Sequence, residues 1–163
     1  MNYSPGDYDK YLCLKPSFAL YLTLVFGVKD FLLVILPTLA SFKSKATNLD
    51  YLASLVQPEM FITDMMVIAV WLALFNRNPD SNLLWKKIWL QGRLMLIAAF
   101  GLHALILLFE QLYVLYTLAN WQRAIDIKML YLLVVDAIFL ANLLTSERIS
   151  DTFSEWPKKN EGT

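Results

Sequence analysis

Six ionisable side chains lie inside segments that are otherwise strongly apolar, and these residues are the ones whose types and spacing could do chemistry. A charged side chain at the centre of a membrane-spanning helix costs about 2.5–3.5 kcal/mol on insertion scales. Groups kept at such a cost are functional candidates, because they can pair with one another or carry a proton or an ion. The six are Lys29, Asp30, Asp64, His103, Glu110 and Asp136.

The depth of these residues along their helices predicts that they face one another. With a rise of 1.5 Å per residue, Lys29 and Asp30 fall near the middle of the first apolar run and Asp136 near the middle of the fourth. Asp64, His103 and Glu110 lie between the centre of their runs and one common side of the membrane. Asp30 points about 100° away from Lys29 around a helix and is a poor partner for it. We therefore predict a Lys29–Asp136 pair, with Asp64 as the second choice for Lys29.

Two uses of this buried polar network remain open. It either fixes the order of the helices as an internal structural network, or it lines a polar path for a proton, an ion or a small solute. Four carboxylates face one lysine and one histidine, so the centre is negatively charged unless some carboxyls are protonated. With one cysteine and one histidine there is no Cys/His zinc site, and we expect no metal and no cofactor.

Four long apolar runs must position these residues. The 163 residues are 58% hydrophobic and 17% charged, whereas a soluble domain is about 25% charged. Runs at 16–40, 58–75, 90–118 and 125–145 are each long enough to span a membrane. The short gaps between them favour antiparallel neighbours. The sequence thus predicts one all-α domain over residues 1–163, a polytopic four-helix transmembrane bundle, with an N-terminal segment at 1–15 and a tail at 146–163.

Two short segments outside the runs are expected to form interfacial helices. Thr47 and Asp50 have the spacing of a capping box at the start of an amphipathic stretch. In the tail, Ile149, Phe153 and Trp156 repeat at helical spacing. We expect each segment to seal an end of the bundle, with partner docking as the alternative.

The distribution of basic residues orients the bundle. Nine lie on the side that holds both termini and four on the other, so we expect both termini in the cytoplasm. We also expect Trp85 and Trp89 at the inner membrane interface. The nine are Lys10, Lys15, Arg77, Lys86, Lys87, Arg93, Arg148, Lys158 and Lys159, and the four are Lys43, Lys45, Arg123 and Lys128.

The residues just before the first run form a candidate cytoplasmic interface. Tyrosine and lysine side chains at headgroup level anchor a helix end. Acidic side chains beside them can pair with the basic residues between the second and third runs. Such a surface pair adds little stability, so a simple anchor is the alternative. The interface consists of Asp7, Tyr8, Asp9, Lys15, Lys86, Lys87 and Arg93.

The stretch "DYDKYLCLKPSFALYLTL" at residues 7–24, in which Pro16 leads directly into an apolar run, resembles the YfeZ-like family of small bacterial inner-membrane proteins. A basic residue inside the first run, here Lys29, also fits that family. The chain departs from it at Leu12, where the resemblance leads us to expect a glycine. The resemblance implies a bacterial inner membrane and supplies no activity.

No enzyme motif is found: the chain has no Gly-x-Ser-x-Gly, no His-Glu-x-x-His and no phosphate-binding glycine loop. Fourteen basic residues balance fourteen acidic ones, which gives no reason to expect a nucleic-acid partner. We expect a non-enzymatic accessory or assembly subunit that binds another integral membrane protein or itself. The alternative is a small transporter or proton-coupled permeation unit that uses the buried charges at mid-membrane.

Overall fold

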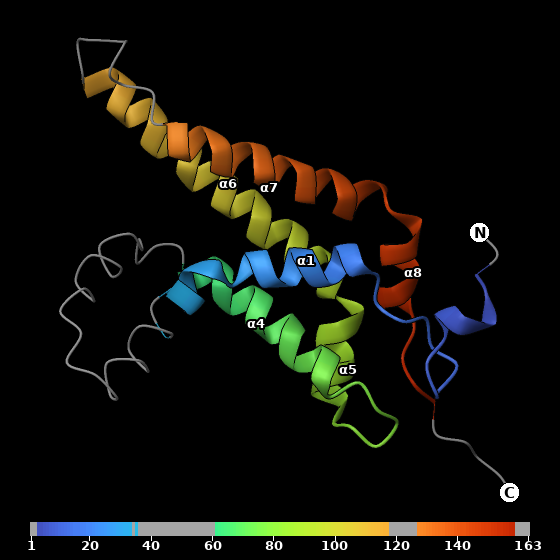
Figure 1. Ribbon diagram of the computed structural model, residues 1–163. Helices are drawn as coiled ribbons and strands as arrows, with labels where there is room; N and C mark the ends of the chain where they lie inside the picture. Colours follow the sequence, from blue (N-terminus) through green and yellow to red (C-terminus); the bar gives the residue numbers. More distant parts are fainter. Residues whose placement is uncertain (1–2, 34, 36–60, 118–126, 159–163) are drawn as a thin grey trace, which may run out of the picture.

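The computed structural model describes residues 3–33, 35, 61–117 and 127–158 (Figure 1). In these residues the regular structure is helical, apart from an isolated β-bridge between Tyr8 and Leu14. The all-α prediction is therefore confirmed for the described part of the chain, and the interfacial helix expected near Thr47 lies outside it. The described elements are the 3-10 helix η1 (Pro5–Asp7) and the α-helices α1 (Phe18–Gly27), α4 (Phe61–Phe75), α5 (Leu83–Leu90), α6 (Gly92–Thr117), α7 (Ile127–Thr145) and α8 (Glu147–Ser154).

Helix α6 is the centre of the arrangement, because it packs against both α7 and α4, while α1 packs on α4. Figure 1 shows α6 and α7 running side by side, with α8 and the N-terminal segment gathered at one end of the helices. We call this end, formed by residues 3–16, α5 and α8, the terminal end.

Side-chain caps begin three of the helices. Ser17 accepts a hydrogen bond from the Leu20 N–H at the start of α1, and Ser146 accepts one from the Ile149 N–H at the start of α8. The Asn82 side chain caps α5 in the same way. Each cap satisfies an N–H group that has no partner within its helix.

The core lies where α1, α4, α6 and α7 meet. The rings of Phe26, Phe100 and Phe139 come from α1, α6 and α7, with centroids 5.1–6.4 Å apart. At Gly27 an added Cβ would sit 2.9 Å from a Val67 methyl carbon. The glycine therefore permits the close approach of α1 and α4.

Helix α5 is a feature that the sequence prediction missed. Residues 83–90 were expected to be a connection, but they form a separate amphipathic helix that packs against α4, α6 and α8. The expected position of Trp89 at the inner membrane interface stays a prediction. Its side chain is fully buried and packs on the Phe153 ring of α8, with centroids 4.6 Å apart.

Among the described helices, α6 alone is long and apolar enough to cross a membrane as a single helix, because it has 26 residues and its most apolar 18-residue stretch has a mean hydropathy of 2.0. The stretch Met129–Thr145 of α7 passes the same test together with α8, across a bend of 65°. Helices α1 and α4 are apolar but shorter.

Candidate functional site

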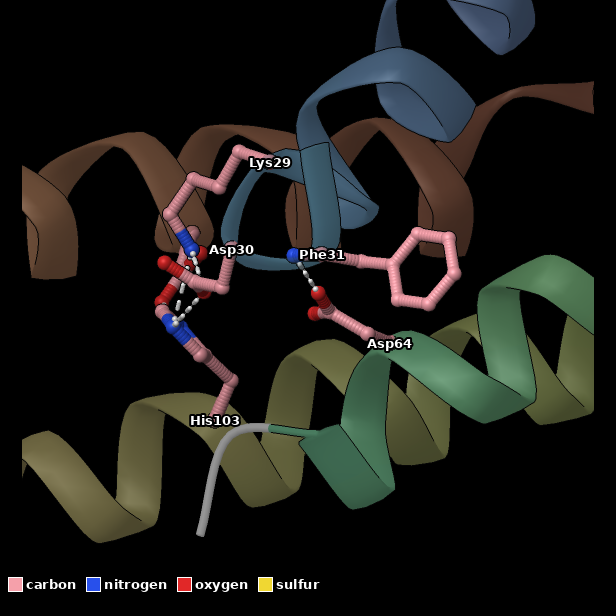
Figure 2. Close-up of polar contacts among 6 residues, drawn as sticks. Lys29, Asp30, Phe31, Asp64 and His103 are labelled. Carbon is pink, nitrogen blue, oxygen red and sulfur yellow. Dashed lines mark hydrogen bonds and ion pairs between the residues drawn. The ribbon is translucent and has the colours of Figure 1, made fainter. Parts of the chain in front are cut away.

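A break in the first helix positions the charged residues. Helix α1 ends at Gly27, Val28 leaves helical geometry (φ −111°, ψ 15°), and the helix resumes at residues 29–33. The first N–H groups of a resumed helix have no partner of their own. Asp64 on α4 supplies one, because its Oδ2 accepts the Phe31 N–H at 2.7 Å (Figure 2). Asp64 thus caps the resumed turn from a neighbouring helix.

Beside this cap, four ionisable residues form a connected chain of hydrogen bonds. The Lys29 ammonium donates to Asp30 Oδ2 at 2.9 Å and lies 3.0 Å from His103 Nε2 (Figure 2). The other ring nitrogen, His103 Nδ1, is 2.5 Å from Asp136 Oδ2. The chain joins the turn after α1 to α6 and α7. We call these four residues the charged cluster.

The contacts of His103 define its tautomer. A carboxylate accepts hydrogen bonds and an ammonium only donates them. His103 therefore donates its Nδ1–H to Asp136 and accepts a hydrogen bond from Lys29 at Nε2. The Lys29–Asp30 ion pair is thus joined to Asp136 through the His103 ring.

The cluster is buried and borders a small cavity. Asp136 is fully buried, and Asp64 and His103 are nearly so. The cavity has about 10 Å³ of water-accessible volume. Its lining includes Phe26, Lys29, Thr63, Asp64, Phe100, His103 and Asp136. That volume holds about one water molecule. The second carboxylate oxygen of Asp136, Oδ1, is buried without a hydrogen-bond partner among the described residues.

The predicted Lys29–Asp136 pair is corrected by this geometry, because His103 stands between the two residues. The expectation that Asp30 would be a poor partner for Lys29 is also wrong. The angle of about 100° concerns the directions in which the two side chains leave the helix. It ignores the reach of a flexible lysine chain, which here turns back to Asp30.

The remaining candidate lies farther along α6. Glu110 is on α6, seven residues after His103, which is about 10 Å along the helix axis. Its side chain is half-buried. The structure thus brings Lys29, Asp30, His103 and Asp136 into one chain and Asp64 to the same cavity, and it places Glu110 about two turns away.

The predicted cytoplasmic interface lies at the terminal end, but its ion pairs differ from the prediction. Asp7 pairs with Arg148 of α8 at 2.8 Å. Asp9 accepts the backbone N–H groups of Tyr11 and Cys13. Neither carboxylate pairs with the basic residues at 86, 87 and 93, because the N-terminal segment packs on α8.

The basic members of that interface have other roles. Lys86 and Lys87 are exposed on α5, and Lys15 donates to the Gly6 carbonyl. Arg93 donates to the carbonyls of Leu143 and Leu144, in the last turn of α7, at 2.9 and 2.8 Å. A cation at a helix C-terminus satisfies these carbonyl groups and opposes the negative end of the helix dipole.

Arg77 and Glu155 close the terminal end and are not among the candidate site residues of the sequence. Arg77 is 9% exposed, donates to the carbonyls of Leu14 and Glu155, and lies over the Trp89 ring at 4.9 Å. The Glu155 carboxylate in turn accepts the Leu14 N–H at 2.5 Å. The amphipathic pattern of residues 83–90 was the signal that could have led to Trp89. For Arg77 the sequence gives no signal beyond a basic residue after an apolar run.

Two pKa shifts follow from the contacts at the terminal end. The hydrogen bond from Arg148 holds the pKa of Asp7 below its ordinary value of 3.8. The hydrogen bond from the Tyr3 hydroxyl to Asp151 raises the pKa of Tyr3 from 10.0 to about 12. Both shifts favour the protonation states that join residues 3–7 to α8.

The backbone of residues 8–14 forms a tight loop closed by the Tyr8–Leu14 bridge. Leu12, at its tip, has φ 60° and is the one non-glycine residue with a positive φ in the described part of the chain. This left-handed conformation favours glycine, which agrees with the glycine expected there from the family resemblance.

A sequence model of the family described as "Protein of unknown function (DUF2919)" matches residues 3–155, so the chain belongs to this family. No curated protein and no solved structure matches the chain. The fold and site define an all-helical protein with a buried charged cluster and at least one helix apolar enough to span a membrane.

Proposed function

We propose that the chain is a multi-pass bacterial inner-membrane protein with four spans, at residues 16–40, 58–75, 90–118 and 125–145, and both termini in the cytoplasm. The apolar composition, the hydropathy of α6 and the nine basic residues on the terminal side support this topology. The N-terminal segment and α8 lie at the same end of the helices, as an even number of crossings requires (Figure 1). The proposal includes the finer family assignment, YfeZ-like, which rests on residues 7–24.

Within this topology the protein acts as a non-enzymatic accessory or assembly subunit. The observation that carries this role is an apolar groove of about 540 Å³ along one side of the first helix. Its side chains Leu22, Val25 and Leu33 are 39–50% exposed, so an apolar face is open to a neighbouring helix. The groove is lined by Leu22, Val25, Phe26, Lys29, Leu32, Leu33 and Phe139.

Lys29 gives this groove a polar point of attachment. Its side chain is 21% exposed, and of the three N–H groups of an ammonium, one donates to Asp30 and one to His103. The third has no acceptor among the described residues, and Lys29 lines the groove. A partly exposed ammonium in hydrocarbon is costly, so a partner helix with a carbonyl, hydroxyl or carboxylate at that depth would stabilise the complex.

Photo-crosslinking in the native membrane tests this role. A crosslinking residue at Val25, which is 50% exposed in the groove, is compared with one at Leu105, which is 52% exposed on α6 outside the groove. We expect a discrete protein adduct from position 25 only, with a reduced yield in the Lys29→Met background. Lipid adducts alone, or equal protein adducts from both positions, would contradict the subunit role.

The second candidate is a proton-coupled permeation unit. It is favoured by one observation, which is that Lys29 lines both the groove and the inner cavity and so connects the groove with Asp136. The protein alone, reconstituted in proteoliposomes with a pH-sensitive dye, should then carry a flux that folded His103→Gln loses. A subunit that only binds a partner carries no flux in either form.

A further inference from the structure

An open pocket lies at the terminal end of the helices and shares no lining residue with the charged cluster. Its volume is about 570 Å³, which is in the range of small-molecule sites, about 300–1,000 Å³. Three segments line it, namely Pro79 and Ser81 after α4, Leu83 and Lys86 of α5, and residues 156–158 after α8. We call it the basic pocket, because two of its lining residues are lysines and none is acidic.

Buried hydrogen bonds hold the walls of the basic pocket in place. Arg77 and Trp89 both donate to the Glu155 carbonyl, at 3.3 and 3.1 Å, and so fix the start of the segment after α8. On the facing segment, the Ser81 hydroxyl donates to the Asn76 carbonyl. The pocket is therefore formed without its ligand, and a preformed site loses less conformational entropy on binding.

The two lysines of the basic pocket have no opposite charge beside them. Lys86 and Lys158 are exposed, and within the described part of the chain neither takes part in an ion pair. Asp80 and Glu155 lie close in sequence, but neither lines the pocket, and the Glu155 carboxylate accepts the Leu14 N–H. Two ammonium groups around one pocket favour an anion, and lysine is a common partner of phosphate oxygens.

The rest of the lining is apolar, which adds a second requirement on the ligand. Leu83 lines the pocket and is 61% exposed, and Leu84 beside it is 55% exposed. Trp156, from the segment after α8, also lines the pocket. Tryptophan is enriched at the headgroup level of membranes, and basic pockets on the cytoplasmic side of membrane proteins bind anionic headgroups. A ligand that fits both kinds of lining has a phosphate group and a hydrocarbon chain.

We propose that the basic pocket binds the phosphate headgroup of one anionic phospholipid from the cytoplasmic leaflet. Lys86 and Lys158 contact the phosphate, and Leu83 contacts the start of an acyl chain. The lipid as the source of the phosphate rests on the proposed topology, in which the terminal end lies at the inner membrane surface. The inference goes beyond the subunit role, because the site needs no protein partner.

Lipid binding to the purified full-length protein tests the site. The protein in mild detergent is titrated with phosphatidylglycerol, and the lipid-bound fraction is measured by native mass spectrometry. We expect one tightly bound lipid per chain. The affinity should fall about 30-fold in Lys86→Gln/Lys158→Gln, because each lysine near a membrane surface contributes about fivefold to the binding of anionic lipid. The matched control Lys10→Gln/Lys87→Gln removes two exposed lysines of the same end that do not line the pocket, and it should bind as the wild type does.

Three results would overturn the proposal. Equal losses in the two double variants, with circular dichroism showing both to be folded, would mean that the lipid responds only to general surface charge. Equally tight binding of the zwitterionic phosphatidylcholine would exclude recognition of a net negative headgroup. Inorganic phosphate that binds as tightly as phosphatidylglycerol, at matched ionic strength, would make the ligand a soluble phosphate. The assay uses neither a protein partner nor a membrane orientation, so its failure is distinguishable from a failure of the subunit role or the topology.

Discussion

Replacement of Gly27 by alanine perturbs the contact that brings the charged residues of the first helix to α4. The new Cβ would lie 2.9 and 3.0 Å from the two Val67 methyl carbons and 3.4 Å from the Phe100 ring. Carbon atoms pack best at about 3.5–4.0 Å, so α1 and α4 must separate by about 0.5–1 Å or Val67 must move. Val67 is 1% exposed, which leaves it little room.

The magnitude follows from the cost of an extra methyl group in a packed core, about 1–3 kcal/mol. Gly101→Ala on α6 is the matched control, because nothing lies within 4 Å of its added Cβ. Both substitutions gain helix propensity, up to about 1 kcal/mol. We therefore expect the free energy of unfolding of Gly27→Ala to lie about 1–3 kcal/mol below that of Gly101→Ala.

The assay is unfolding of the full-length protein in mild detergent, followed by helical circular dichroism. A double-mutant cycle with Val67→Ala adds a second readout, because removing both methyl carbons makes room for the new Cβ. A favourable coupling of about 0.5–3 kcal/mol is expected. Equal stability of Gly27→Ala and Gly101→Ala, or zero coupling with Val67→Ala, would refute the close contact of α1 and α4.

Three further predictions concern the terminal end. Leu12→Gly should raise the free energy of unfolding by up to about 1 kcal/mol, because glycine adopts φ 60° without the penalty of a Cβ. Leu12→Ala keeps a Cβ and should give no such gain. An equal gain from both variants in denaturant titrations would show that the left-handed backbone is not the reason. Trp89→Phe should lower the free energy of unfolding by about 1–3 kcal/mol, because the carbonyls of Thr152 and Glu155 lose their indole donor. An unchanged thermal midpoint would contradict this prediction. Because the Arg148 hydrogen bond lowers the pKa of Asp7, the contribution of this pair to stability is present above pH 3.8 and is lost as the pH falls through the lower folded-state pKa. Asp7→Asn should therefore flatten the acid side of the stability–pH curve, and identical curves would show that the pair contributes nothing.

The parts of the site that followed from the sequence depend on helix geometry. A constant rise per residue places Lys29, His103 and Asp136 at matching depths once the apolar runs are recognised. The cost of a charge in hydrocarbon then requires that such residues face one another. This reasoning uses only distances along each helix, so it predicts which residues lie at the same depth.

The pairing within that layer could not be predicted, because it depends on how each helix is rotated and where it breaks. The interruption at Val28 turns Lys29 and Asp30 relative to α1 and exposes the N–H that Asp64 caps. No proline or glycine occupies position 28 to signal the break. The position of His103 between Lys29 and Asp136 follows from the same rotation.

The terminal end shows a similar limit. Arg77 and Trp89 are twelve residues apart, but both bond to carbonyl groups near residue 155, so their burial depends on α5 and α8 folding back across the helix ends. Composition and hydropathy assign an arginine after an apolar run to the membrane surface. Only the tertiary structure shows its guanidinium over a buried indole ring.

The subunit role is tested most directly by native mass spectrometry of the full-length protein, released from its own membrane into nanodiscs or mild detergent. We expect a stoichiometric complex with another integral membrane protein or with a second copy of the chain, and its loss in Lys29→Met, which removes the polar point of the groove. A wild-type chain that emerges as a bare monomer, or a complex that survives Lys29→Met unchanged, would contradict the proposed use of the groove.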